Sequence, residues 1–71
     1  MKTTSEIIQL AGTGVKIIIN ANDFETSEII SIVGAVGLLD SQILIKNASS
    51  KSNSDLLMIL THYSRNITLE L

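Results

Sequence analysis

The sequence contains no cysteine, so neither a disulfide bond nor a zinc site built on thiolates can stabilise its fold. It has 71 residues, which predicts one small domain over residues 1–71. A domain of this length buries only about 60% of the surface that its unfolded chain exposes. The remaining stability must come from dense packing or from association with a partner subunit.

Basic and aromatic residues are scarce. Five basic residues and a net charge of −2 give no electrostatic footprint for a nucleic-acid backbone, and Phe24 and Tyr63 are too few for a base-stacking platform. The most apolar run, residues 29–39, is shorter than the about 20 residues that a bilayer-spanning helix needs. There is no basic, apolar-cored signal peptide either. We therefore expect a cytoplasmic location and neither a nucleic acid nor a membrane as partner.

Apolar residues, by contrast, make up 45% of the chain and give a mean hydropathy of +0.39, which excludes a disordered protein. Their arrangement shows an internal repeat. Residues 4–8 and 26–30 both read Thr-Ser-Glu-Ile-Ile, and residues 53–57 read Asn-Ser-Asp-Leu-Leu. Each copy is typical of a helix start, because its small polar residues can cap free N–H groups and its acid lies near the positive end of the helix dipole.

The apolar residues after each start recur at positions i, i+3, i+4 and i+7, which predicts three amphipathic helices. Thr3 and Glu6 have the spacing of a capping box at the first of them. Gly34 and Gly37 weaken the second helix, and we expect them to let a neighbouring element come close. The three predicted stripes are Ile7, Leu10, Ala11 and Gly14; Ile29, Ile32, Val33 and Val36; and Leu56, Ile59, Leu60 and Tyr63.

A short run rich in β-branched residues follows each predicted helix, at residues 15–20, 43–46 and 67–71. One face of these runs is strongly apolar and the other is mixed, so we expect all helices to cover the apolar face. Strands joined through a helix are almost always parallel, with right-handed crossovers. The sequence therefore predicts a two-layer α/β fold, with three parallel strands in order 1-2-3 and the helices on one face. The αβ repeats of this short solenoid cover about residues 3–20, 25–46 and 52–71.

The pattern Ile17-x-Ile19-x-x-Asn22-x-Phe24 resembles the leucine-rich repeat, whose motif reads L-x-L-x-x-N/C-x-L and whose period is about 20–29 residues. The helical half of the longer repeats of that family is similar to the segment that begins at residue 26. This resemblance implies a non-enzymatic protein-binding module that uses its sheet face.

A second resemblance starts from the residues that open the middle helix. A strand, then Phe-Glu-Thr-Ser at residues 24–27, then a strand followed by Asn-Ala-Ser at residues 47–49 resembles part of a STAS domain, the fold of anti-sigma-factor antagonists. In that family a serine at the helix start is phosphorylated to control partner binding. The resemblance implies that role for Ser27.

The residues that usually carry catalysis are isolated in this sequence. His62 is the only histidine, and we expect it on the third helix, off the apolar stripe, as a partly exposed side chain. The glycines at 12 and 14 precede a strand, whereas phosphate-binding glycines follow one. An enzyme site would lie beyond the carboxyl ends of the strands, where Asp23 is the only general acid or base. We therefore predict no catalytic residue, cofactor or metal site.

The open sheet face carries the clearest functional pattern. Three rows are expected to cross it: Lys16, Gln42 and Asn66; Ile18, Leu44 and Thr68; and Asn20, Lys46 and Glu70. An apolar row between polar rows is typical of a docking surface, although an ordinary half-exposed sheet face has the same pattern. An open strand edge also favours pairing with another subunit, so we expect a protein partner, a homo-oligomer or membership of a longer repeat array. The predicted partner-binding residues are Lys16, Ile18, Gln42, Leu44, Lys46, Thr68 and Glu70.

Overall fold

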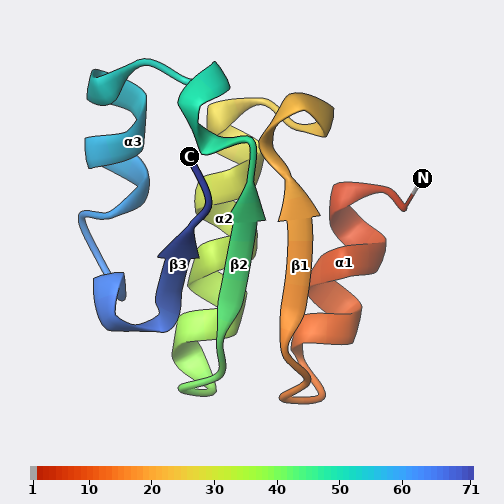
Figure 1. Ribbon diagram of the computed structural model, residues 1–71. Coiled ribbons are helices and arrows are strands. Elements are labelled where there is room, and N and C mark those ends of the chain that lie inside the picture. Colours follow the sequence, from red (N-terminus) through yellow and green to blue (C-terminus); the bar gives the residue numbers. More distant parts are fainter. Residues whose placement is uncertain (1) are drawn as a thin grey trace.

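The computed structural model describes residues 2–71, which form three consecutive helix–strand units. The strands lie in front of the helices in Figure 1, with α1 beside β1, α2 behind β2 and α3 beside β3. This confirms the predicted two-layer α/β fold. The helices are α1 (Thr4–Ala11), α2 (Thr26–Leu38) and α3 (Asn53–Ile59), and the strands are β1 (Ile17–Asn20), β2 (Ile43–Lys46) and β3 (Ile67–Leu69). Single 3-10 turns are η1 (Ala21–Asp23), η2 (Ala48–Ser50) and η3 (Ser64–Asn66).

The helix starts are stabilised by their own side chains. At α1 the Thr3 Oγ1 accepts the N–H of Glu6 at 3.2 Å, and the Glu6 Oε1 accepts the N–H of Thr3 at 2.9 Å, so the predicted capping box is present. At α2 the Glu28 Oε1 accepts the N–H of Glu25 at 2.9 Å. These bonds satisfy N–H groups that have no partner within the helix.

The sheet has the predicted order and register. Parallel pairing joins β1 to β2 and β2 to β3, so the order is β1-β2-β3. Ile17, Ile43 and Ile67 lie side by side across the three strands. Because side chains alternate between the two faces of a strand, this register also aligns the residues of the open face.

The core lies between the helices and the apolar face of the sheet. The stripe of α2 is completely buried, and so are Ile43 and Ile45 of the central strand, which are 1% and 0% exposed. The outer strands contribute less, since Ile17, Ile67 and Leu69 are only half-buried against the core. The central helix–strand unit is therefore covered on both sides by its neighbours, whereas each outer unit has one open side.

The ends of several predicted elements differ from the structure. Helix α3 ends at Ile59, so His62 and Tyr63 lie in the loop beyond it, and the positive φ of Tyr63 (60°) excludes a helical conformation there. Gly14 likewise follows the end of α1 and has a φ of 85°. The predicted stripes were wrong at these two positions, because a turn reverses the chain before the fourth apolar residue is reached.

The two interior glycines of α2 have different surroundings. A Cβ placed on Gly37 would overlap the ring of Tyr63, so the close neighbour there is a side chain of the loop after α3 and not a helix or strand. A Cβ on Gly34 would meet no atom of residues 2–71 within 4 Å, and the prediction was wrong for this glycine. Tyr63 thus leaves the third helix and packs its ring on the second.

Candidate functional site

The open face of the sheet presents the central row predicted from the sequence. Ile18, Leu44 and Thr68 pair across the three strands. Ile18 is 65% exposed, Leu44 is half-buried and Thr68 is exposed. Since the helices lie on the other side of the sheet, this row faces solvent in the described part of the chain (Figure 1).

Polar residues border this apolar row on both sides. Lys16 and Gln42 are exposed just before β1 and β2. Beyond the row lie Lys46 and Glu70, which are also exposed. The N–H of Glu70 donates to the Ile45 carbonyl at 2.9 Å, which extends the ladder of β3 by one residue and places Glu70 beside Lys46. The structure therefore brings together all seven predicted residues of the open face.

Asn66 is the exception among the residues expected on this face. It is 1% exposed, and its Nδ2 donates to Asp40 Oδ1 at 2.9 Å and to the Ser41 carbonyl at 2.8 Å. The expectation was wrong because Asn66 lies in η3 before the strand begins, where the turn at Asp40 (φ 52°) offers two acceptors. Arg65, which is exposed, forms an ion pair of 3.5 Å with the same carboxylate.

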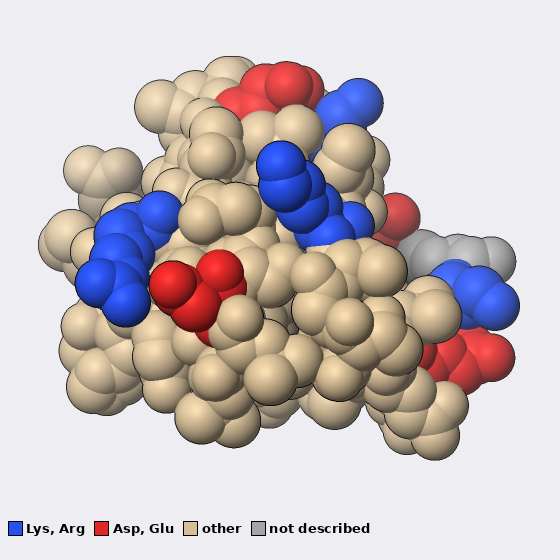
Figure 2. All heavy atoms as spheres, turned by 90° about the horizontal axis from the view of Figure 1, so that it is seen from below, with Lys and Arg blue, Asp and Glu red and all other residues tan. Residues whose placement is uncertain are grey.

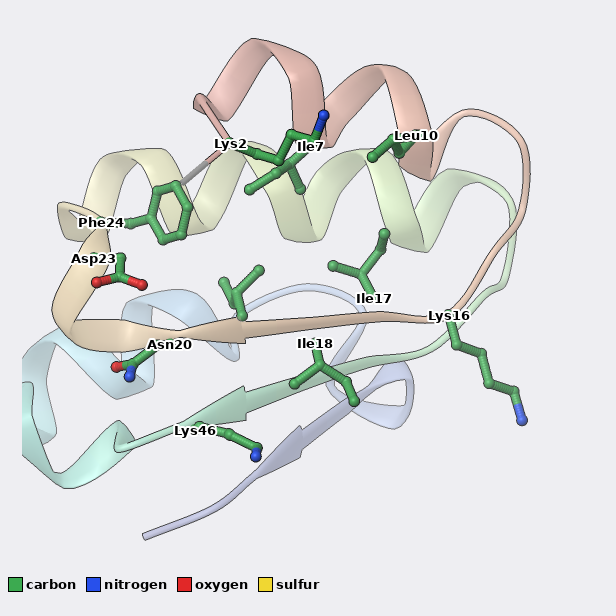
Figure 3. Close-up of a pocket in the computed structure, with 11 residues that line it drawn as sticks. Lys2, Ile7, Leu10, Lys16, Ile17, Ile18, Asn20, Asp23, Phe24 and Lys46 are labelled. Atoms are coloured by element: carbon green, nitrogen blue, oxygen red, sulfur yellow. The ribbon is translucent and has the colours of Figure 1, made fainter.

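A groove that the sequence did not indicate runs along the free edge of β1. It has a volume of about 440 Å³ and lies between β1 and α1 (Figure 3). All four residues of β1 line it, although their side chains alternate between the two faces, so the groove follows the strand edge. Figure 3 shows Ile17 on the α1 side of the strand and Ile18 on the opposite side.

Helix α1 supplies one apolar wall of this groove, opposite the isoleucines of β1. Ile7 and Leu10 line it, and Leu10 is 46% exposed although it belongs to the predicted core stripe. In the sequence, Leu10 is marked only by its place in the apolar stripe, which predicts burial. Periodicity shows which residues share a helix face, but it does not show whether another element covers that face.

Two carboxylates at the helix starts have shifted pKa values because they accept capping hydrogen bonds. The Thr3 backbone N–H, with the Thr3 hydroxyl and the Lys2 charge, holds the pKa of Glu6 below its ordinary value. The Glu25 backbone N–H, with the Thr4 hydroxyl, lowers the pKa of Glu28 in the same way. Within residues 2–71, no group of three histidine, cysteine or acidic side chains is placed to hold a metal ion.

The other residues considered from the sequence occupy separate places. His62 is exposed, with its ring edge-on to that of Tyr63 at 6.4 Å. Ser27 is exposed in the first turn of α2. The Asn20 Oδ1 accepts the N–H of Asn22 at 2.9 Å and so caps η1 at the carboxyl end of β1. Within residues 2–71, the side chains of His62, Ser27 and Asn20 form no hydrogen bond with one another.

The face shown in Figure 2 carries charged side chains of both signs among a larger uncharged area, with some basic and acidic side chains next to one another. None of the helices formed by residues 2–71 has the length and apolar character required to cross a bilayer.

Comparison of the chain with protein families, curated proteins and solved structures finds no match in any of the three. The function of the chain therefore has to be inferred from its own geometry.

Proposed function

We propose that this chain is a non-enzymatic, cytoplasmic protein-interaction module of the leucine-rich-repeat-like type that also self-associates. One observation carries the proposal: all three helices lie on one face of the sheet, which leaves the opposite face as a continuous surface. That surface has an apolar centre and polar borders, as protein interfaces commonly have.

The exposed row supplies both the affinity and the orientation that docking requires. Burying the Ile18 side chain, which is 65% exposed, would remove apolar surface from water at about 25 cal/mol per Å². Lys16 just before β1, Lys46 at the end of β2 and Glu70 just after β3 offer charged groups at the rim. Charged rim groups fix the register of a partner and speed its association more than they increase affinity.

Site-specific photo-crosslinking tests the proposal in cells that produce the chain. A photoreactive residue in place of Leu44, at the centre of the row, should give a defined adduct with a partner protein or with a second copy. The matched control carries the same residue in place of Ser31, which is exposed on the central helix α2. Ile18→Asp should abolish the Leu44 adduct. Equal labelling from both positions would contradict the proposal.

A second candidate function is a phospho-regulated binding module of the STAS type. Ser27 supports it, because its side chain is exposed in the first turn of a 13-residue helix. Phosphate groups are favoured at this end of a helix. The same crosslinking experiment separates the two functions: Ser27→Asp should abolish the Leu44 adduct if Ser27 is a switch, with Ser27→Ala as control, and should leave it unchanged otherwise.

A further inference from the structure

One apolar position is exposed in α1 but buried in the other two helices. Leu10 follows the acid of its helix start by four residues, as do Ile32 in α2 and Ile59 in α3. Ile32 is 0% exposed and Ile59 is 2% exposed, whereas Leu10 is 46% exposed and lines the groove beside β1. The first unit therefore lacks the cover that a preceding unit gives to the second and third.

At the α3 end of the molecule, the side of the helix that points away from α2 is also uncovered. Ile30 of α2 lines a small cavity with Met58 and Ile59, so it faces the following helix, and it is 36% exposed. Leu57 occupies the same position in α3 and is 69% exposed. The position that faces the next helix in α2 is therefore exposed to solvent in α3, the last helix of the row.

A ladder of side-chain hydrogen bonds links the helix starts and is open at both ends. The first residue of α1 and that of α2 each donate to the acid of the next helix: Thr4 Oγ1 to Glu28 Oε2 at 2.8 Å, and Thr26 Oγ1 to Asp55 Oδ2 at 3.1 Å. Asn53 holds this donor position in α3, and its side chain makes no hydrogen bond to the described residues. Glu6 holds the acceptor position in α1, where it accepts hydrogen bonds from Thr3 within residues 2–71.

One further hydrogen bond joins the residues that precede the caps of two neighbouring helices. Lys51, just before the cap of α3, donates from its Nζ to the carbonyl of Phe24, the residue just before the cap of α2, at 2.7 Å. Lys2 holds this position before α1. Its ammonium can therefore reach a Lys51 carbonyl if the third unit of another copy precedes α1.

The strand edges have matching backbone groups. The N–H of Ile17 donates to the carbonyl of Gln42, just before β2, so the N–H and carbonyl of Ile18 point to the free edge of β1. The N–H of Glu70 donates to Ile45 on β2, so the backbone groups of Leu69 point to the free edge of β3. Both edges run in the same direction, and parallel pairing of one with the other continues the sheet.

We propose that copies of this chain associate head-to-tail, with the β3–α3 end of one copy docked in the groove between β1 and α1 of the next. This inference rests on the proposed self-association and names its geometry. The occupant is a second copy because one interface completes the apolar cover, the hydrogen-bond ladder and the strand pairing together, using the contacts that already join α2 to α3. Two unlike ends make the contact heterologous, so copies form an open filament or a closed ring.

Two variants that each block one end test the geometry. Leu10→Asp places a charge at the β1–α1 end, and Leu57→Asp places one at the β3–α3 end. Both side chains are exposed in the single copy, so circular dichroism should show both variants folded. The matched control is Leu38→Asp, since Leu38 is 76% exposed at the end of the central helix.

Sedimentation velocity and native mass spectrometry give the readout. The unmodified chain and Leu38→Asp should form species larger than dimers as concentration rises, and each blocking variant alone should be monomeric. An equimolar mixture, with one variant labelled with nitrogen-15, should give a mixed dimer and nothing larger, because one intact interface remains.

Three results would overturn the head-to-tail geometry. Blocking variants that still assemble would place the interface elsewhere and leave self-association itself intact. A mixture that stays monomeric would show that the contact is not between the two unlike ends. An unmodified chain that stays monomeric at every concentration would remove self-association as well and would point to another protein segment at these ends, while the crosslinking test of the sheet face would be unaffected.

Discussion

At the scale of single residues, the two glycines inside α2 show how one residue type can serve different purposes. Gly37 gives the ring of Tyr63 room to pack on the helix, whereas Gly34 borders open space. Glycine in a helix costs about 1 kcal/mol relative to alanine, because its backbone loses more conformational freedom on folding. Only at Gly37 is this cost offset by a packing contact, which the ring of Tyr63 makes.

Substituting each glycine by alanine should therefore have opposite effects. Gly34→Ala should raise the free energy of unfolding by about 1 kcal/mol, since it improves helix propensity in free space. Gly37→Ala should lower it by about 1–3 kcal/mol, because the new methyl group displaces Tyr63. Urea unfolding of the two variants measures the difference. A gain in stability from Gly37→Ala would show that Tyr63 does not pack on α2.

Asn66 shows a residue whose surroundings come from a distant turn. Its amide donates to Asp40 and to the Ser41 carbonyl, some 25 residues earlier in the chain. The sequence around Asn66 resembles the start of a strand with a polar residue on the open face. The turn at residues 40–41 instead supplies two oxygens that accept from the buried Asn66 amide.

At the scale of the elements, the residues at each helix start cap their own helix and also link it to the neighbouring unit. The carboxylate of Glu28 accepts the backbone N–H of Glu25 within α2 and the hydroxyl of Thr4 from α1. Both bonds favour the charged form, and the pKa of Glu28 is lowered, with the Glu25 N–H as the larger cause. The repeated Thr-Ser-Glu sequence thus explains both capping and contact between helices.

A lowered pKa makes this contribution depend on pH. Glu28 binds protons less readily when folded, so its stabilisation is present above 4.5, the ordinary value, and is lost as the pH falls through the lower folded pKa. Glu28→Gln should flatten the fall of unfolding free energy below pH 4.5. Thr4→Ala should flatten it less, because the Glu25 bond remains. Chemical unfolding at a series of pH values measures both, and an unchanged slope in Glu28→Gln would contradict the assignment.

At the scale of the whole molecule, the sheet separates a buried face from a free one. Ile45 of the central strand is 0% exposed, whereas Ile18 of β1 is 65% exposed on the other face. The same substitution at the two positions therefore tests the assignment of the faces.

Ile45→Asp should leave the chain unfolded at 25 °C. It loses about 2–5 kcal/mol of apolar packing and buries an unpaired charge, in a domain whose total stability is of similar size. Ile18→Asp should change the free energy of unfolding by less than about 1 kcal/mol, because its carboxylate stays in water. Circular dichroism distinguishes the two variants. A folded Ile45→Asp protein, or an unfolded Ile18→Asp protein, would reverse the assignment of faces.

The local pattern of the chain was enough to predict its architecture. Apolar and polar residues alternate in three short runs, which predicts strands, and apolar residues recur with a period of 3.6 in the segments before them, which predicts helices. Right-handed crossovers on one face of the sheet then allow only one order of the strands. The open-face residues followed from the same register, because Ile17, Ile43 and Ile67 set the phase of every row. All of this information lies in patterns within single segments and in the order of the segments along the chain.

Contacts between distant segments decided the rest. Three features depend on which element lies opposite a residue, and periodicity does not show which element that is. They are the burial of Asn66, the packing of Tyr63 on Gly37 and the exposure of Leu10. Leu10 and Ile32 occupy equivalent positions in two similar helices, yet one is bare and the other is buried. The difference arises because a row of packed units has a first and a last member, and only folding in three dimensions shows which side chains lie at its ends.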